Sequence, residues 1–175
     1  AMYRRKSGGG CVYADEGGRM MSLISPNTHS EVVFQSFLDR ISDVLRDCGY
    51  EAVKSEHNDI MVNGMKVSGN ACYATPTGCI VHGTLLVNVD FEALQHAITP
   101  SVEKLAKHGV KSVRQRVANL ASIANTTAEI STPGQFASIL HQVLCSHDRE
   151  LAADEIDAIN QIEQSYLEQQ FIKGK

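Results

Sequence analysis

A short glycine-rich segment near the start of the chain holds the residue types that bind anions. It reads Arg4-Arg5-Lys6-Ser7-Gly8-Gly9-Gly10 and continues into Cys11-Val12-Tyr13-Ala14-Asp15. Glycine has no Cβ, so a run of three lets a ligand approach the main-chain amides closely, and an arginine can donate two parallel hydrogen bonds to a carboxylate or phosphate. A flexible linker is also rich in glycine, but a linker rarely continues directly into residues with β propensity. The segment therefore predicts a loop that cradles an anion.

Two stretches farther along the chain add charged side chains. Asp59 precedes the pair Asn63-Gly64, and Lys66 follows it. Asparagine followed by glycine is a strong signal for a two-residue hairpin, so Asp59 and Lys66 are expected to face one cavity. A lone lysine on a strand is more often a solvated edge residue, and a lone aspartate often caps a turn. Their combination is what favours chemistry.

Two further clusters are ambiguous when each is taken alone. His82, Gly83 and Thr84 lie inside an apolar stretch, and Arg114 and Arg116 lie in a basic one. A histidine in an apolar strand is usually a satisfied core residue, and two arginines on a helix are usually solvated. Their occurrence together with the glycine-rich segment makes a shared site the better interpretation.

Hydrophobic periodicity and turn residues predict the elements that must position these side chains. Strands are expected at Cys11–Asp15, Met20–Ile24, Tyr50–Lys54, Asp59–Val62, Lys66–Tyr73 and Ile80–Leu86. Helices are expected from a Thr28–Glu31 capping box to Gly49, and at Phe91–Ile98, Ser101–Lys107, Val113–Ile123, Thr132 to His147 and Asp154–Gln169. The order gives a β-rich half over residues 3–90 and a mainly helical half over residues 91–170, which indicates an α+β fold.

Composition excludes several classes of partner. With 16 basic and 20 acidic residues the net charge is -4, which gives no reason to expect nucleic acid or an anionic membrane surface. No apolar run has the length of a transmembrane helix. Five cysteines without a C-x-x-C pair are typical of reduced thiols, so a cytoplasmic location is expected.

Five segments, taken in order, resemble the motifs of the lipoate–protein ligase A family. They are Arg4–Asp15, Asn58–Ile60, Gly64–Ala71, His82–Leu86 and Gly109–Leu120. Any one would be a weak match, but five in order make the resemblance specific from residue 3 to about residue 125. It implies a catalytic domain of the biotin/lipoate ligase type, which is class II synthetase-like, with mixed, largely antiparallel β-sheets flanked by helices.

The resemblance also implies a two-step reaction. ATP activates lipoate to lipoyl-adenylate with release of pyrophosphate, and the acyl group then passes to a lysine of a lipoyl-carrier domain. Carriers of this kind are the E2 subunits of 2-oxoacid dehydrogenases and the H protein of glycine cleavage. Lys66 would bridge the lipoate carbonyl and the α-phosphate, where charge develops. Asp59 would bind Mg²⁺, which prefers oxygen ligands and is shared with phosphates.

The remaining site residues follow from the same resemblance. Those expected to contact ATP or the adenylate, besides Lys66, are Arg5, Ser7, Gly9, Gly10, Cys11, Val12, Tyr13, Asn58 and Ala71. Those expected to form the acyl pocket are Gly8, His82, Gly83 and Thr84. Arg114 and Arg116 are expected on a loop that closes over the adenylate.

The chain departs from the family pattern in detail and in length. Ala14 stands where the family commonly has histidine, and Gly17-Gly18 where it has Gly-Asn, which alters the pocket without touching Lys66 or Asp59. Family members carry a segment upstream of the paired arginines and a small downstream domain or separate partner. Residues 1–175 are therefore expected to form a single catalytic domain that is truncated at its N-terminus and has no C-terminal accessory domain. An accessory domain acting in trans is a further expected partner.

Three other functions stay open at this point. An octanoyltransferase of the same superfamily would need a nucleophilic cysteine shortly before the lysine strand, where this chain has Ser55-Glu56-His57. A fragment that binds lipoate or a carrier without turnover is a second alternative. A biotin ligase is a weaker one, because its loop favours the spacing G-R-G-R-x-G, which this chain lacks.

Overall fold

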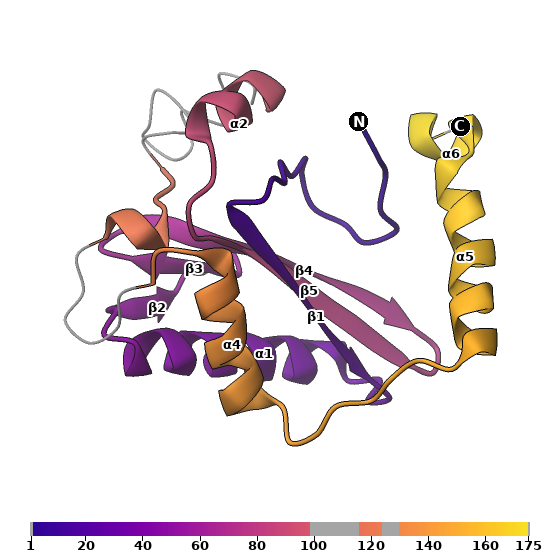
Figure 1. Cartoon of the computed structure of the whole chain (residues 1–175), viewed down its shortest axis with the longest axis horizontal. Coiled ribbons are helices and arrows are strands. Elements are labelled where there is room, and N and C mark those ends of the chain that lie inside the picture. Colours follow the sequence, from indigo (N-terminus) through magenta and orange to yellow (C-terminus); the bar gives the residue numbers. More distant parts are fainter. Residues whose placement is uncertain (1, 99–115, 124–129, 175) are drawn as a thin grey trace.

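One antiparallel sheet organises the computed structural model, which describes residues 2–98, 116–123 and 130–174 (Figure 1). Its five strands lie in the order β1-β5-β4-β3-β2. They are β1 (Gly18–Ser25), β2 (Ala52–Lys54), β3 (Asp59–Val62), β4 (Met65–Thr75) and β5 (Gly78–Leu86). Four of the six predicted strands, β2 to β5, are therefore confirmed with at most small changes at their ends. Strand β1 is also present but is longer than predicted, and Cys11–Asp15 is not a strand.

Helix α1 (Ser30–Asp47) covers one face of this sheet and buries the predicted apolar stripe, including Phe37, Ile41 and Leu45. The helix ends as predicted at Gly49, whose φ of 90° is left-handed. The Gly49 N–H donates to the Arg46 carbonyl and the Tyr50 N–H to the Leu45 carbonyl, the paired bonds of a Schellman motif.

The prediction of a capping box formed by Thr28 and Glu31 is wrong. Ser30 begins the helix after His29, and no side chain caps its first turn. The main-chain N–H of His29 instead donates to Asn27 Oδ1 over 2.9 Å. The local hydrogen bond from Asn27 thus sets where the chain enters the helix.

The other helices of the described residues lie around the sheet (Figure 1). Helix α2 (Phe91–Ala97) follows β5, and α4 (Pro133–Leu144) packs against α1 and β1 and buries Phe136 in the same core. Helix α5 (Ala153–Leu167) and helix α6 (Gln169–Lys173) stand beside the N-terminal segment. None of the helices in the described part of the chain is long and apolar enough to cross a membrane.

Two segments that were predicted to be a strand and a helix are extended chain where the structure describes them, and both lie over the sheet face opposite α1. Cys11–Asp15 makes no strand pairing, and Tyr13 packs instead on a small apolar cluster that includes Leu86 and Leu94. The Asp15 carboxylate accepts hydrogen bonds from the main chain of Gly17 and Asp90, both over 2.9 Å. Residues of this segment with high β propensity therefore pack their side chains on the apolar cluster, and their main chain does not join the sheet.

The predicted helix over Val113–Ile123 is also wrong where the structure describes it. Arg116–Asn119 is not helical, and Leu120–Ser122 forms a single 3-10 turn. Lys66 in β4 donates its N–H to the Arg116 carbonyl over 2.8 Å and accepts from the Ala118 N–H over 3.0 Å. The predicted helix over Ser101–Lys107 lies outside the described residues, as does Arg114.

Asn119 anchors this extended segment to the end of β5. Its buried amide accepts from the Val89 N–H and donates to the Val89 carbonyl, each over 2.9 Å. An amide side chain that pairs with both main-chain groups of one residue imitates a sheet contact. The segment that carries Arg116 is thereby fixed to the sheet.

We therefore expect Asn119→Ala to destabilise the fold, because it leaves the Val89 N–H and carbonyl buried without partners. The loss should be about 1–3 kcal/mol in the free energy of unfolding by urea. Asn160→Ala, on the exposed surface of α5, is the control and should change stability by less than about 0.5 kcal/mol. Equal values for the two variants would show that the Asn119 pairing contributes nothing.

Candidate active site

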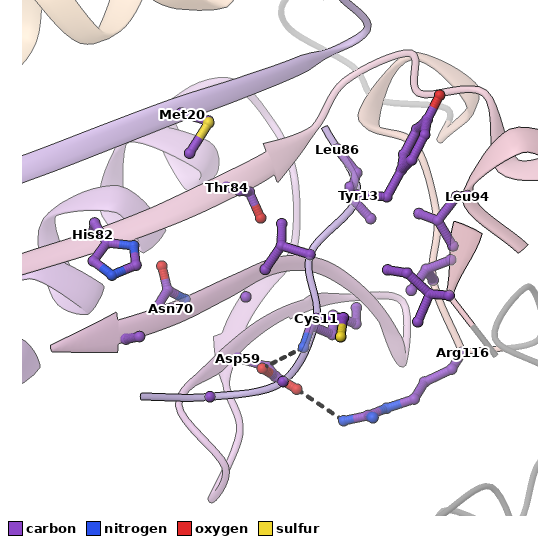
Figure 2. A pocket seen from close by; sticks show the side chains of 18 of the residues that line it. Cys11, Tyr13, Met20, Asp59, Asn70, His82, Thr84, Leu86, Leu94 and Arg116 are labelled. Carbon is purple, nitrogen blue, oxygen red and sulfur yellow. Dashed lines mark hydrogen bonds and ion pairs between the residues drawn. The ribbon is translucent and has the colours of Figure 1, made fainter. Parts of the chain in front are cut away.

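A cavity of about 640 Å³ lies between the glycine-rich segment and the sheet face opposite α1. Its walls come from β1, β3, β4, β5, α2 and the extended segment at Arg116. In Figure 2, Tyr13, Leu86 and Leu94 lie toward one end, and Met20, Thr84 and His82 toward the other. Asp59 and Cys11 also line the cavity. The volume is in the usual range for small-molecule sites.

A β-bulge brings Lys66 into this cavity. In the register of β3 with β4, Asp59 pairs with Gly69 and Ile60 with Ser68, but Met61 pairs with Lys66. Val67 is therefore an extra residue without a partner on β3. Side chains alternate along a strand, so Lys66 and Gly69 would face opposite sides if the strand were regular. The bulge returns Lys66 to the same face as Gly69 and Asp59.

Gly69 leaves the space that the Lys66 side chain occupies. A Cβ at Gly69 would lie 3.1 Å from Lys66 Nζ, closer than ordinary van der Waals contact. The lysine thus lies back over its own strand toward Asp59 rather than into solvent. Gly69 is absent from the sequence-based site, because its importance depends on the bulge.

The centre of the cavity is an ionic cluster built on one carboxylate. Lys66 Nζ lies 2.7 Å from Asp59 Oδ1, and Arg116 Nη2 lies 3.0 Å from Asp59 Oδ2. The Asp59 side chain is 8% exposed, whereas those of Lys66 and Arg116 are each 25% exposed. The negative charge is therefore enclosed by two cations that keep access to the cavity. Two positive charges against one negative leave a net positive cluster, which attracts an anionic ligand.

Asp59 does not fit the predicted role of magnesium ligand as it lies here. Both of its oxygens are already engaged by cations. A third positive charge at this position would be repelled by Lys66 and Arg116. Within the described ranges, no group of three or more histidine, cysteine, aspartate or glutamate side chains could hold a metal. The residues present thus form an anion site rather than a cation site.

The glycine-rich segment folds around the Arg5 side chain. Arg5 Nη2 donates to the carbonyls of Gly8 and Gly10 over 2.9 and 2.8 Å. Gly9 has a φ of +99°, and a Cβ there would lie 2.8 Å from the same guanidinium nitrogen. The turn therefore requires glycine at this position. Arg5 Nε is buried without a hydrogen-bond partner in the described structure, and such an orphan donor is consistent with a missing acceptor.

Ser7 and His82 join this loop to the sheet. Ser7 Oγ lies 2.6 Å from His82 Nε2. Burial, and secondly the charge of Arg5, lowers the pKa of His82 below its ordinary value. The imidazole is therefore neutral at pH 7, when it can share one hydrogen with the serine hydroxyl.

The structure brings most of the predicted site residues to the cavity wall. Those that line it are Arg5, Gly9, Gly10, Cys11, Val12, Tyr13, Asp59, Lys66, Ala71, His82, Thr84 and Arg116. Of the predicted residues that the structure describes, four do not line it: Ser7, Gly8, Asn58 and Gly83. Ser7 acts through His82, Gly8 offers its carbonyl to Arg5, and the Asn58 carbonyl accepts from Asn70 Nδ2 over 2.9 Å. A side chain at Gly83 would collide with the Asn70 side chain, so Gly83 makes room for a neighbour.

Sequence reasoning assigned no role to several wall residues, some of which stand inside the quoted motifs. They are Met20, His57, Gly69, Asn70, Leu86, Leu94, Ile98 and Val117. The apolar members lie on strands and helices whose hydrophobic residues suggest only a core. No single-sequence signal separates a core leucine from one that lines a cavity.

Comparison with known proteins identifies close likenesses. Residues 1–144 match the family model described as the lipoyl protein ligase A/B catalytic domain. Lipoate–protein ligase 1 of Staphylococcus aureus is 39% identical over 128 residues, which cover 73% of this chain but only 39% of that protein. The chain thus spans about two fifths of the length of this curated relative.

Solved structures show the same fold. A bipartite lipoate protein ligase from Thermoplasma acidophilum, described together with its E2 lipoyl domain, aligns with 99% of this chain and 70% of its own, at a TM-score of 0.77 and 23% identity. A lipoate-protein ligase A bound with ATP aligns with 99% of this chain and 72% of its own, at a TM-score of 0.75 and 22% identity. The predicted α+β architecture of the ligase type is confirmed.

The state of His82 predicts how stability depends on pH. Because the pKa of His82 is lower in the folded chain, the unfolded chain binds a proton first as the pH falls below about 6.5. The free energy of unfolding should therefore be unaffected by this group above pH 6.5 and should decrease as the pH falls toward the lower, folded pKa.

Urea unfolding at about pH 7.5 and 5.5, on either side of the ordinary histidine pKa, measures this effect. The wild-type chain should lose more stability between the two conditions than His82→Gln does. His147→Gln, at an exposed position, should behave as wild type. A loss of equal size in wild type and His82→Gln would contradict the assignment.

Proposed function

This chain belongs to the lipoyl protein ligase A/B catalytic-domain family, and we propose that it activates lipoate with ATP and transfers the lipoyl group to a lysine of a carrier domain. One observation carries the proposal: Lys66 and Arg116 form a positive cluster around Asp59 in the wall of the cavity that the glycine-rich segment also lines. The adenine and α-phosphate would enter from the Tyr13 end and the acyl chain from the His82 end. The carboxylate and the α-phosphate would then meet at Lys66.

The first step needs positive charge where two anions meet. A carboxylate oxygen of lipoate attacks the α-phosphorus, the bond from that phosphorus to the bridging oxygen breaks, and pyrophosphate leaves. Lys66 has three ammonium hydrogens, of which Asp59 takes one. The other two are available to the carboxylate and the α-phosphate, where they offset repulsion and hold the reactants in line. Arg116 and the orphan Nε of Arg5 are the additional donors for phosphate oxygens.

The part of the glycine-rich segment that folds around Arg5, which we call the glycine loop, would hold the nucleotide. Gly9 and Gly10 leave room for the phosphates against the main chain, while Cys11, Val12 and Tyr13 would line the adenine. The apolar surface of Leu94 and Ile98 at the same end suits a planar base. Ala71, with no side chain beyond Cβ, would leave space where the two substrates join.

The other end of the cavity would take the acyl chain. Thr84 and His82 lie on β5 with Met20 opposite on β1, and they give an uncharged wall in which the methionine and the threonine methyl group are apolar. A neutral His82 suits an apolar chain better than an imidazolium would.

In the second step the lysine amine of the carrier attacks the acyl carbonyl of the mixed anhydride. The bond to the phosphate oxygen breaks, AMP leaves, and the amine loses a proton as the amide forms. Lys66 would stabilise the negative charge that develops on the carbonyl oxygen. E2 lipoyl domains and the glycine cleavage H protein are the proposed carriers, supported by the E2 lipoyl domain described with the Thermoplasma relative.

The cysteines do not favour a transferase mechanism. Cys72 packs with the core on the α1 side of the sheet, away from Lys66. Burial, and then the neighbouring Cys79, raises the pKa of its thiol, which makes it a poor nucleophile at neutral pH. Cys11 lines the cavity, so Cys11→Ser is the variant that separates the two mechanisms.

Lipoate-dependent exchange between ATP and labelled pyrophosphate tests the first step. Lys66→Met keeps the length of the side chain but removes its charge, and the exchange rate should fall at least about 100-fold, the usual cost of losing a donor to developing charge. Lys54→Met, on β2 and paired with Asp39, is the matched control and should retain the wild-type rate.

Two results would overturn the proposal. One is exchange that survives in Lys66→Met. The other is the absence of exchange in folded wild-type chain that transfers acyl groups from acyl carrier protein and loses this activity in Cys11→Ser.

A further inference from the structure

The glycine loop is held almost entirely by side chains. In the described part of the chain, no main-chain hydrogen bond joins residues 2–14 to a strand. The first main-chain bond from this region to a strand is the one that the Asp15 carbonyl accepts from Gly18, where the chain enters β1. The position of Arg5 and Gly8–Gly10 in the cavity therefore depends on side-chain contacts at both ends of the loop. Tyr13 and Asp15 make those that follow it, and the contacts at its beginning are made by Arg4, Lys6 and Ser7.

These contacts point in two directions. Arg5 and Ser7 turn inward, to the loop carbonyls and to His82. Arg4 and Lys6 turn outward, to the helices α5 and α6 that stand beside the segment in Figure 1. We call α5 and α6 together the C-terminal arm. The arm thus contacts the residues on both sides of Arg5.

Arg4 packs on the end of α6. Its Nε donates to the carbonyl of Ile172 over 3.0 Å. Gly174, with a φ of +71°, ends the helix, and a Cβ there would lie 2.7 Å from Arg4 Cζ. The last carbonyls of a helix lack partners within it. Arg4 supplies one, and Gly174 leaves the space for its guanidinium.

Lys6 packs on an aromatic pair that joins the two helices of the arm. Its ammonium lies 5.4 Å from the centre of the Tyr166 ring on α5, a cation–π contact. The Tyr166 ring meets Phe171 of α6 edge to face, with centroids 5.0 Å apart. The surface that receives Lys6 is therefore fixed by both helices.

Helix α5 of the arm is not held in place by buried apolar side chains. None of the residues of α5 is buried, and Ile156, Ile159 and Ile162 on it are exposed. A helix gains most of its stability in a protein from packing an apolar face. Here the contacts with Arg4 and Lys6 take that place.

We propose that the C-terminal arm positions the glycine loop for substrate binding, with Tyr166 and Gly174 as positioning residues that act through Lys6 and Arg4. The inference rests on the proposed function for its kinetic consequence, but not for its structural one. When the arm contact is lost, the loop is in its binding conformation for a smaller fraction of the time. The apparent affinity for ATP falls by that fraction, whereas the rate of the bound complex is unchanged.

Tyr166→Ala and Tyr166→Phe separate the aromatic contact from the rest of the residue. Phenylalanine keeps the ring and the cation–π contact, so it should match wild type. Alanine should raise the KM for ATP about two- to fivefold with little change in kcat, the scale of an exposed cation–π contact. Gly174→Ala displaces Arg4 and should have the same effect through the other contact. Ile159→Ala, on the exposed surface of the same helix, is the control.

Limited proteolysis measures how exposed the loop is to protease, and it does not require the protein to be active. Trypsin cuts after arginine and lysine, and Arg4, Arg5 and Lys6 stand in the segment itself. Cleavage there should be about two- to fivefold faster in Tyr166→Ala and Gly174→Ala than in wild type, and unchanged in Tyr166→Phe and Ile159→Ala.

The outcomes for the arm and for the reaction are distinct. Cleavage in both Tyr166→Ala and Gly174→Ala at the rate of Ile159→Ala would overturn the positioning role. Equal cleavage rates in Tyr166→Phe and Tyr166→Ala, both raised, would also overturn it, because the ring would not be the contact. If Tyr166→Ala and Gly174→Ala are cleaved faster but the folded wild-type chain shows no lipoate-dependent exchange, the positioning role of the arm is supported and the proposed reaction is not.

Discussion

The paired cations on Asp59 are the constraint around which the site is organised. A buried carboxylate is costly unless it is paired, and this one is paired twice, with Lys66 and Arg116. The two cations come from segments that lie fifty residues apart in the sequence, which have to meet at one point. The bulge at Val67 and the space at Gly69 bring the lysine there. The main-chain bonds between Lys66 and the segment after Arg116 bring the arginine.

The same cluster explains the character of the cavity. Its net positive charge gathers at Asp59, in the wall of a cavity that is lined by Tyr13 and Leu94 toward one end and by Met20, Thr84 and His82 toward the other. A ligand that joins a planar base and an acyl chain through an anionic group fits this arrangement, and an acyl-adenylate has that form. The loop built on Arg5 closes one side, tied to the sheet by Ser7 and to the C-terminal arm by Arg4 and Lys6.

The sequence predicted what depends on local pattern. The stripe of α1, its end at Gly49, the hairpin at Asn63-Gly64 and the strands that carry Asp59 and Lys66 are all confirmed. It failed where a long-range contact decides the conformation. Val113–Ile123 has helical periodicity, but pairing with Lys66 holds its described part extended. Tyr13 has β propensity, but the apolar cluster at Leu86 takes the side chain and leaves the main chain unpaired. The hairpin predicted that Asp59 and Lys66 face one cavity, but the bulge has no signal in one sequence, so the double ion pairing of Asp59, and with it the misfit to a metal, appeared only in the structure.

A double-mutant cycle on Asp59 and Lys66 tests the central claim most directly. The free energy of unfolding would be measured for wild type, Asp59→Asn, Lys66→Met and the double variant, by urea at pH 7 in low salt. If Asp59 organises the site through its ion pairs, the coupling between the two residues should exceed about 1 kcal/mol, more than exposed pairs give. Single-variant effects that add to within about 0.5 kcal/mol would contradict it, because independent sites behave in that way.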